Sequence, residues 1–257
     1  MPAKKSSPRG GTKAKKPEVV NNENKDQSPY VWQRDKIKCD LNIRDLDWTL
    51  NQERFIDLAM QKNMRVMFVN GPAGTAKTLL ASYVSLHLLN QRKISDICYL
   101  RSAVESSDAG IGFLPGSAEE KMAVYNAPFW DKMNELLSSG DQKKLIDDSR
   151  IHCMPINYIR GLNWNAKAII LDEAQNSTEK ELVTTITRLG HFTRCFICAD
   201  PKQTDLNGKA GGFQKLYNLF EHDREALDHG IYTFQFDEED IMRSELVKYI
   251  VKRLENL

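Results

Sequence analysis

The sequence predicts an α/β fold in which a mostly parallel β-sheet carries helices on both faces. Segments with helical periodicity separate several short runs that are almost wholly apolar, and such runs are typical of strands buried on both sides of a parallel sheet. No apolar run approaches the roughly 20 residues of a membrane-spanning helix. The four clearest strand runs are 66–69, 97–100, 168–171 and 195–199.

Length and composition are those of a soluble globular protein. The chain has 257 residues, 41% of them hydrophobic and 28% charged, which allows one large domain or two small ones. The net charge is only +1, but residues 1–17 contain lysines and one arginine and no acidic residue. We predict a disordered basic tail over 1–30 and a single domain over 31–257. The tail either holds a polyanion such as nucleic acid or serves as a solubilising extension.

The cysteines indicate a reducing compartment. No secretory signal is evident, so we expect a cytoplasmic protein without a membrane partner, whose thiols belong to the core. Cys195 and Cys198 form a lone C-x-x-C pair, and a metal site there would need two further ligands that the sequence does not offer. We therefore do not expect zinc or redox chemistry at this pair.

A glycine-bearing loop lies between the first strand run and a helical segment that begins at Leu79. The backbone N–H groups of such a loop and the positive end of the helix suit a phosphate group. Lys77 would neutralise the β- and γ-phosphates, and the Thr78 hydroxyl would ligate Mg²⁺. An ordinary strand-to-helix turn is the alternative. The predicted cofactor-binding residues of the loop are Gly71, Pro72, Ala73, Gly74, Thr75, Ala76, Lys77 and Thr78.

A helix over 50–59 is expected just before the loop strand, with Asn51 as its N-cap. Gln52 lies at the start of this helix. Its amide could form two hydrogen bonds with the edge of an adenine base, or it could be a solvated glutamine without a partner.

Two acidic residues follow the apolar run 168–171. Asp172 would hold Mg²⁺ through its water shell, and Glu173 would orient and deprotonate the attacking water. Adjacent acids at this place can also be a simple helix cap. Gln203, after the next strand, could sense the γ-phosphate. Arg243, near the start of a terminal helix, could reach the nucleotide or lie at the surface.

The remaining elements follow from the same patterns. Arg160, in the connection that follows the strand 151–156, could face a phosphate or a carboxylate. Ser177 or Thr178 would cap the helix 178–189. We expect further helices over 119–137 and 213–220 and from 240 onward, and a last strand over 231–236.

Taken together, these motifs resemble the PhoH-like family of P-loop ATPases, whose core is similar to the first motor domain of superfamily-one helicases. The resemblance covers roughly residues 50 to 250. It implies a RecA-like P-loop core, Mg²⁺-dependent ATP hydrolysis, engagement of single-stranded RNA or DNA, and assembly into a ring, often a hexamer. It assigns catalysis to Lys77, Glu173, Gln203 and Arg243, nucleotide contacts to Gln52, Arg243 and the loop, and the metal to Thr78 and Asp172. The matching segments are 71–78, 101–105, 112–116, 158–161, 172–176, 200–206 and 242–244.

Two departures from the family pattern concern turnover. Ala76 replaces a usual glycine, which would cost roughly 1–2 kcal/mol if the position requires a positive φ, and Ala199 replaces another.

Only one RecA-like domain fits this chain, so an arginine finger would come from a neighbouring subunit, with Arg160, Arg188 and Arg194 as candidates. A nucleotide-gated scaffold with little turnover is the main alternative function. A P-loop kinase is a further alternative, and such an enzyme would need an arginine-rich lid over the γ-phosphate.

Overall fold

The computed structural model describes residues 40–102, 118–203, 211–242 and 253, with the side chains of 118–125 excluded. The predicted basic tail, Arg243 and, apart from residue 253, the predicted terminal helix beyond Met242 lie outside the described residues. The same holds for the whole motif segment 112–116, for residues 103–105 of the segment 101–105 and for residues 204–206 of the segment 200–206.

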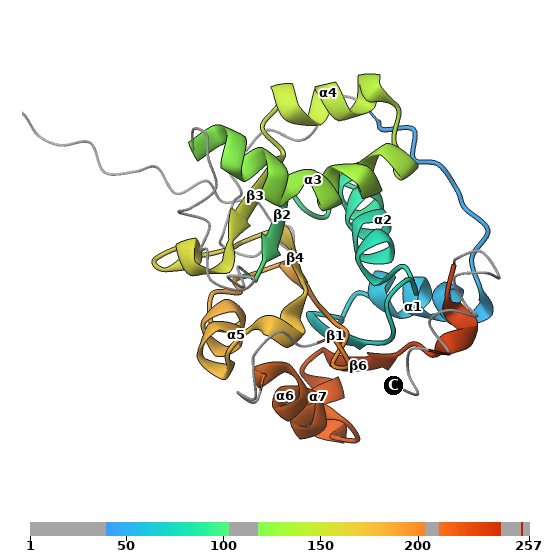
Figure 1. The fold of residues 1–257 in the computed structure, drawn as a ribbon, viewed down its shortest axis with the longest axis vertical. Coiled ribbons are helices and arrows are strands. Elements are labelled where there is room, and N and C mark those ends of the chain that lie inside the picture. The colour runs from blue at the N-terminus through green and yellow to red at the C-terminus, as the bar shows by residue number, and fades with distance from the viewer. Residues whose placement is uncertain (1–39, 103–117, 204–210, 243–252, 254–257) are drawn as a thin grey trace, which may run out of the picture. The chain divides into compact units, whose positions relative to one another are not determined.

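A six-stranded parallel sheet forms the centre of the fold (Figure 1). Its strand order is β3-β2-β4-β5-β1-β6, and every neighbouring pair is parallel. The strands are rich in β-branched, aromatic and other apolar residues, and β5 is buried along its whole length. The predicted strands are all present: β1 (Val66–Asn70), β2 (Asp96–Arg101), β3 (Ile151–Pro155), β4 (Lys167–Asp172), β5 (Arg194–Ala199) and β6 (Ile231–Gln235).

Helices connect the strands, and side chains cap the starts of α1, α4, α5 and α7. Thr178 caps α5 in a capping box with Glu181, as one of the two predicted caps. The sequence analysis did not predict α4 or α7, which have only nine and five residues and are capped by Ser138 and Asp223. No helix among the described residues is both long and apolar enough to pass through a bilayer. The helices are α1 (Leu50–Met60), α2 (Lys77–Asn90), α3 (Ala118–Leu136), α4 (Ser139–Asp147), α5 (Glu179–Ile186), α6 (Gly212–Phe220) and α7 (Arg224–Asp228).

The start of α1 differs from the sequence prediction. Thr49, not Asn51, is the N-cap: its side chain accepts a hydrogen bond from the Gln52 backbone N–H, and the Gln52 side chain accepts one from the Thr49 backbone. This capping box places Gln52 at the third helical position. Gln52 is fully buried, so its reading as a solvated glutamine is wrong.

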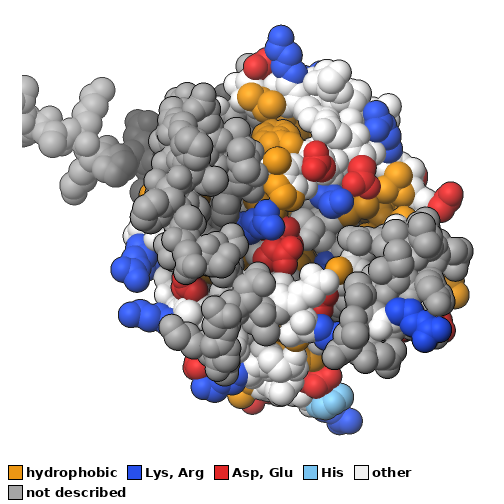
Figure 2. Space-filling model, in the orientation of Figure 1, with side chains coloured by type: hydrophobic (Ala, Val, Ile, Leu, Met, Phe, Trp, Pro, Cys, Tyr) orange, Lys and Arg blue, Asp and Glu red, His pale blue; other side chains and the backbone are white. Residues whose placement is uncertain are grey.

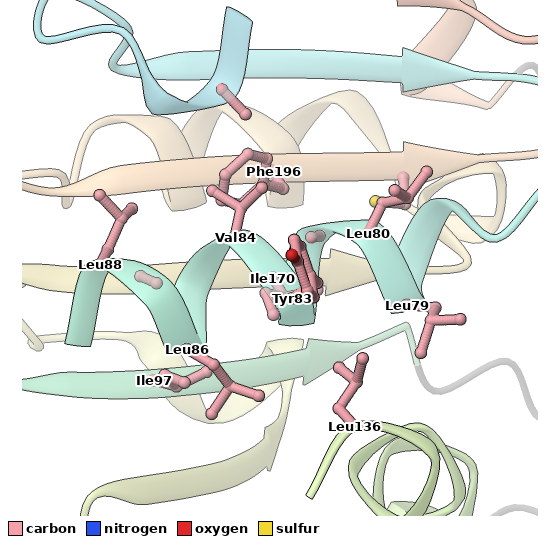
Figure 3. Close-up of a cluster of buried hydrophobic side chains, with 14 of the residues drawn as sticks. Leu79, Leu80, Tyr83, Val84, Leu86, Leu88, Ile97, Leu136, Ile170 and Phe196 are labelled. Atoms are coloured by element: carbon pink, nitrogen blue, oxygen red, sulfur yellow. The ribbon is translucent and has the colours of Figure 1, made fainter. Parts of the chain in front are cut away.

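The core lies in two layers, one on each face of the sheet. α1, α2 and α3 contribute to the first layer, and α5 and α6 contribute to the second. Figure 3 shows Val84 of α2 against Phe196 of β5 and Leu86 of α2 near Ile97 of β2. Since α2 is buried on nearly all sides, the helix that follows the glycine-bearing loop is held firmly against the sheet.

The two cysteines of β5 belong to different layers. Cys198 packs in the layer of α1 and α2, and Cys195 packs in the opposite one, because residues three apart on a strand point to opposite faces. Burial raises the pKa of the Cys195 thiol to about 12, and the pKa of Cys198 is also raised, first by burial. The pair cannot converge on one metal ion or form a disulfide with each other.

The topology brings three strand ends together. β5 lies between β1 and β4, and the register aligns Asn70 of β1 with Ala199 of β5. On the other side of β5, Leu171 of β4 is level with Ile197. The segments that follow β1, β4 and β5 therefore leave the sheet side by side at its carboxyl edge, where parallel α/β sheets bind ligands. This arrangement is that of a RecA-like P-loop fold.

Candidate functional site

The loop between β1 and α2 turns sharply before the helix begins at Lys77. Gly74 and Ala76 both have positive φ, of 88° and 62°, and the Thr75 hydroxyl donates a 2.9 Å hydrogen bond to the Pro72 carbonyl. Ala76 is therefore in the left-handed conformation that favours glycine, at a cost of roughly 1–2 kcal/mol. The position does require the backbone conformation that the sequence analysis considered.

Lys77 folds back over this loop. Its Nζ donates hydrogen bonds of 2.7 and 2.8 Å to the carbonyl oxygens of Gly71 and Pro72. Burial lowers the pKa of the Lys77 amine, and the negative charge of Asp200 is the strongest opposing influence. A phosphate group entering the loop would offer this amine a stronger partner than the two neutral carbonyls.

Thr78 and Asp172 meet across the space between α2 and the end of β4. The Thr78 hydroxyl donates a 2.6 Å hydrogen bond to Oδ1 of Asp172, and the Tyr99 hydroxyl donates one of 2.8 Å to Oδ2. Tyr99 is buried in β2 and stacks on Phe129 of α3. A hydroxyl and a carboxylate held this close are oxygen ligands of the kind that Mg²⁺ prefers, so the donor set fits this ion.

Glu173 follows Asp172 and projects from a strained backbone with φ of 53°. Oε2 of Glu173 accepts a 2.6 Å hydrogen bond from the side-chain amide of Gln175, and a guanidinium nitrogen of Arg101 lies 4.0 Å from Oε1. The side chain remains 39% exposed. Glu173 is thus oriented by its neighbours while one side stays open to solvent, which suits a general base.

The turn after β5 completes this side of the site. Oε1 of Gln175 accepts a 3.0 Å hydrogen bond from the Asp200 backbone, and the Gln175 amide also reaches the carbonyl of Gln203 at 3.2 Å. The side chain of Gln203 is exposed. Gln175 is buried and had no individual role in the sequence analysis, because a glutamine beside two acids carries no pattern that distinguishes it.

One cavity of about 460 Å³ unites these groups. Lys77 and Thr78 line it from the start of α2, Asp172 and Glu173 from the end of β4 and the residue after it, and Gln203 from the turn after β5. The structure thus brings Lys77, the predicted metal ligands and the described catalytic residues to one cavity, whereas Gly71, Pro72 and Thr75 of the predicted loop set do not line it. Ala73, Gly74 and Ala76 also line the cavity.

Helix α3 adds a wall that the sequence analysis missed. Pro128, Lys132 and Glu135 line the same cavity, and the Lys132 amine lies 3.1 Å from the Glu135 carboxylate. A lysine and a glutamate three residues apart look like any exposed helical pair. No sequence signal could therefore have placed them beside the loop.

Gln52 is placed differently from the other predicted residues. Its Nε2 donates to the carbonyls of Asp240 at 3.1 Å and Thr75 at 3.4 Å, so both ends of the amide have partners within the protein. The predicted contact with an adenine base stays a prediction. Arg243 lies just beyond the described residues.

A family model described as PhoH-like protein matches residues 47–255 of this chain. The chain belongs to the PhoH-like family. A PhoH-like protein of Mycobacterium leprae is 35% identical over 204 residues, which make up 79% of this chain and 56% of that protein. The PhoH-like protein of Bacillus subtilis is 33% identical over 79% of this chain and 62% of its own length.

A more distant relative is the protein PhoH of Escherichia coli K12, which is 29% identical over 76% of this chain and 54% of its own length. The chain thus spans a little over half the length of these curated PhoH-like relatives. The matched region contains the whole cavity described above, so the site belongs to the part that this chain shares with the family.

Proposed function

We propose that this PhoH-like chain is an ATPase that binds Mg²⁺ and ATP in the cavity between β1, β4 and β5. The observation that carries the proposal is the 2.6 Å hydrogen bond between Thr78 and Asp172, next to Lys77. It brings a helix-start hydroxyl and a strand-end carboxylate to one point beside a phosphate-binding loop. An ordinary strand-to-helix turn would not require this constellation.

Each residue has a role in this proposal. Lys77 binds the β- and γ-phosphates, while the loop from Gly71 to Ala76 directs backbone N–H groups at them. Thr78 and Asp172 would hold Mg²⁺, which supplies neutralisation of the phosphate charge when bound.

The remaining roles concern the γ-phosphate and the attacking water. Glu173 orients that water and accepts its proton, because its carboxylate is held beside the metal ligands and stays partly open to solvent. Gln203 contacts the γ-phosphate from the turn after β5, and Arg243 senses the nucleotide.

We further propose that the ATPase works as a homo-oligomeric ring of the hexameric kind that the resemblance to the family implies, in which neighbouring subunits complete one another's sites. We also propose that it engages single-stranded RNA or DNA in the cytoplasm. The basic segment 1–17 supports a polyanionic partner. In Figure 2, basic and acidic side chains are interspersed over the coloured part of this face. The basic side chains drawn there do not form a continuous stripe. Our argument for a nucleic-acid partner rests on the basic segment 1–17.

The structure narrows the candidates for an arginine finger from a neighbouring subunit. The Arg194 guanidinium donates hydrogen bonds to the carbonyls of Met64, Gln61 and Lys62 near the end of α1. Burial, with a smaller effect of Arg65, lowers the pKa of Arg194 to about 10. Arg194 therefore has a structural role and is excluded as a finger. Arg160 is exposed and Arg188 half-buried, and both stay candidates.

The experiment that tests this function is ATP hydrolysis with and without single-stranded RNA and DNA, at low and at moderate salt. We expect Mg²⁺-dependent turnover, stimulated by one of the polymers and less so at higher salt. A Glu173→Gln variant should retain ATP binding and lose hydrolysis. Equal turnover in variant and parent would remove Glu173 from the mechanism, and turnover that ignores both polymers would reject nucleic-acid coupling.

A nucleotide-gated scaffold with little turnover is the second candidate function. The observation that favours it is the left-handed backbone of Ala76, at a position where the resemblance to the family implies glycine. Tight ATP binding by the parent without measurable hydrolysis would establish the scaffold and reject the ATPase.

A further inference from the structure

We propose that Gln52 is a positioning residue that holds the phosphate-binding loop in its anion-binding shape, together with Asp240 and Met242, and does not read the base. This inference rests on the proposed binding of nucleotide. It assigns to Gln52 a different role from the adenine contact expected from the sequence. We call Gln52, Asp240 and Met242 the loop clasp.

The loop clasp joins the start of α1 and the segment after β6 to two carbonyls of the loop. Gln52 Nε2 donates hydrogen bonds to the carbonyls of Asp240 at 3.1 Å and Thr75 at 3.4 Å. The Met242 backbone N–H donates one of 2.9 Å to the carbonyl of Gly74. Two successive carbonyls of the loop, those of Gly74 and Thr75, are thus bound from the same structural unit.

Binding these carbonyls sets the direction of the neighbouring N–H groups. In a planar trans peptide, the C=O of one residue and the N–H of the next point in opposite directions. With the Gly74 carbonyl held by Met242, the N–H of Thr75 is turned to the opposite side. Gln52 likewise holds the Thr75 carbonyl, so the N–H of Ala76 is turned to the side opposite that carbonyl. These are the groups that a phosphate-binding loop must present to the anion.

The loop clasp also explains how Ala76 keeps a strained conformation. A left-handed alanine persists only where the surroundings determine the backbone on both sides. The Thr75–Ala76 peptide is bound by Gln52, and Ala76 is followed at once by α2, which is buried on the sheet. Loss of Gln52 would release one of these two constraints and let the loop relax.

Asp240 is itself firmly anchored. The residue is 3% exposed, and its carboxylate accepts hydrogen bonds from the hydroxyl of Thr49 at 2.6 Å, the amide of Asn51 at 2.7 Å and the backbone of Asp237 at 3.2 Å. Upstream, the Phe236 backbone donates a 2.8 Å hydrogen bond to the carbonyl of Asn70. The segment 236–242 therefore runs beside the chain from Asn70, just before the loop, to Gly74 within it.

The surroundings of Gln52 argue against contact with a base. Its Oε1 already accepts from the Thr49 backbone at 3.0 Å, and Nε2 has two acceptors. Gln52 is fully buried and is not among the described residues that line the cavity. Reading an adenine edge would break the capping box of α1 and free the loop carbonyl at the same time.

The test measures the dissociation constants of ATP, GTP and 7-deaza-ATP for the parent and Gln52→Ala at a temperature where both are folded. GTP has a different base edge, and 7-deaza-ATP lacks the N7 acceptor of adenine. We expect Gln52→Ala to lose about tenfold in affinity for all three, since one or two buried hydrogen bonds contribute on that order. Asp240→Asn, which loosens the anchor without touching the loop, should shift all three in the same direction.

Asn90→Ala is the matched control. The Asn90 amide also makes two hydrogen bonds to backbone, with the N–H and carbonyl of Leu41 at 2.9 Å each, at the other end of α2 from the loop. It should lower the melting temperature and leave the three affinities unchanged. If Gln52→Ala cannot be obtained folded, Gln52→Met, which keeps the length of the side chain, replaces it.

A loss confined to ATP would show that Gln52 reads the base and would overturn the positioning role. Unchanged affinities in Gln52→Ala would overturn it as well, and so would an equal loss in Asn90→Ala, because the effect would then be one of general stability. A parent protein that binds none of the three nucleotides would instead refute the proposed function.

Discussion

The side chain of Gln175 connects the carboxylate of Glu173 to the turn that follows β5. One amide makes three contacts: 2.6 Å from Nε2 to Glu173 Oε2, 3.2 Å from Nε2 to the Gln203 carbonyl, and 3.0 Å from the Asp200 backbone to Oε1. The proposed base and the proposed γ-phosphate sensor are thus held by the same buried group. A displacement of one of them would therefore displace the other.

This connection predicts the effect of Gln175→Ala. ATP turnover should fall by about ten- to a hundredfold, because a misplaced base loses catalysis steeply with distance. ATP affinity should change by less than about threefold, since Lys77 and Thr78 are untouched. Steady-state turnover and equilibrium binding measure the two effects. Gln214→Ala, which removes an exposed amide paired with Asn218 on α6, is the control; a similar loss in both variants would contradict a specific role.

The resemblance to the family implies glycine at the positions of both Ala76 and Ala199, yet replacing the two alanines by glycine should have opposite effects. Ala76→Gly relieves a left-handed alanine and should stabilise the protein by about 1 kcal/mol. Ala199 lies in β5 and is almost fully buried, so Ala199→Gly should destabilise by about 1–2 kcal/mol through backbone entropy and lost burial. Thermal unfolding measures both, and shifts of the same sign would refute the strain at Ala76.

Gly71 is packed too closely for a side chain. A Cβ there would lie 2.7 Å from Cβ of Phe236 and 3.2 Å from its carbonyl oxygen. Gly71→Ala should therefore push the segment 236–242 away from the loop, lower the melting temperature and weaken nucleotide binding.

Gly140→Ala is the control for this substitution. It lies in α4, where the nearest atom to a new Cβ is Ser138 Oγ at 3.8 Å, so helix propensity should make it neutral or stabilising by up to about 1 kcal/mol. Parental affinity in Gly71→Ala would show that the loop tolerates the displacement.

Lys77 should make nucleotide binding depend on pH in the alkaline range. Burial lowers its pKa in the free protein below the ordinary 10.5. Since phosphate favours the charged amine, ATP affinity should be highest while Lys77 is protonated and should decline as the pH rises through the lowered pKa. The phosphates themselves are fully ionised above about pH 8. The stability of the free protein has the opposite sign, because the unfolded chain holds the proton more tightly, so it should rise with pH over this window.

Titration of ATP affinity from about pH 8 to the ordinary lysine value of 10.5 checks this dependence. Lys77→Arg, which keeps its charge throughout, should lack the alkaline decline in whatever affinity it retains. Lys77→Ala should lose ATP binding outright at all pH values. Unchanged affinity in Lys77→Ala would refute the assignment of the phosphate-binding loop.

Local pattern was enough to predict much of this protein. The strands were predictable because a strand buried on both faces has an apolar run, as β4 has over 168–171 and β5 over 195–199. The predicted phosphate-binding loop follows directly after β1, and Asp172 directly follows the apolar run of β4. Parallel strands end at the same edge, so their grouping in one cavity could be anticipated. The capping of α5 by Thr178 was predictable because it depends on residues within one turn.

What only the tertiary structure decided depends on partners far apart in the chain. Asp240, whose carbonyl binds the Gln52 amide, is 188 residues away from it, and Lys132 reaches the cavity only because α3 packs beside α2. Arg194 was a plausible finger until its guanidinium was found on the end of α1. The sequence by itself determined the chemistry available at the carboxyl edge of the sheet, because apolar periodicity is local. The partners of each polar side chain were decided by the packing of distant segments, which no local pattern records.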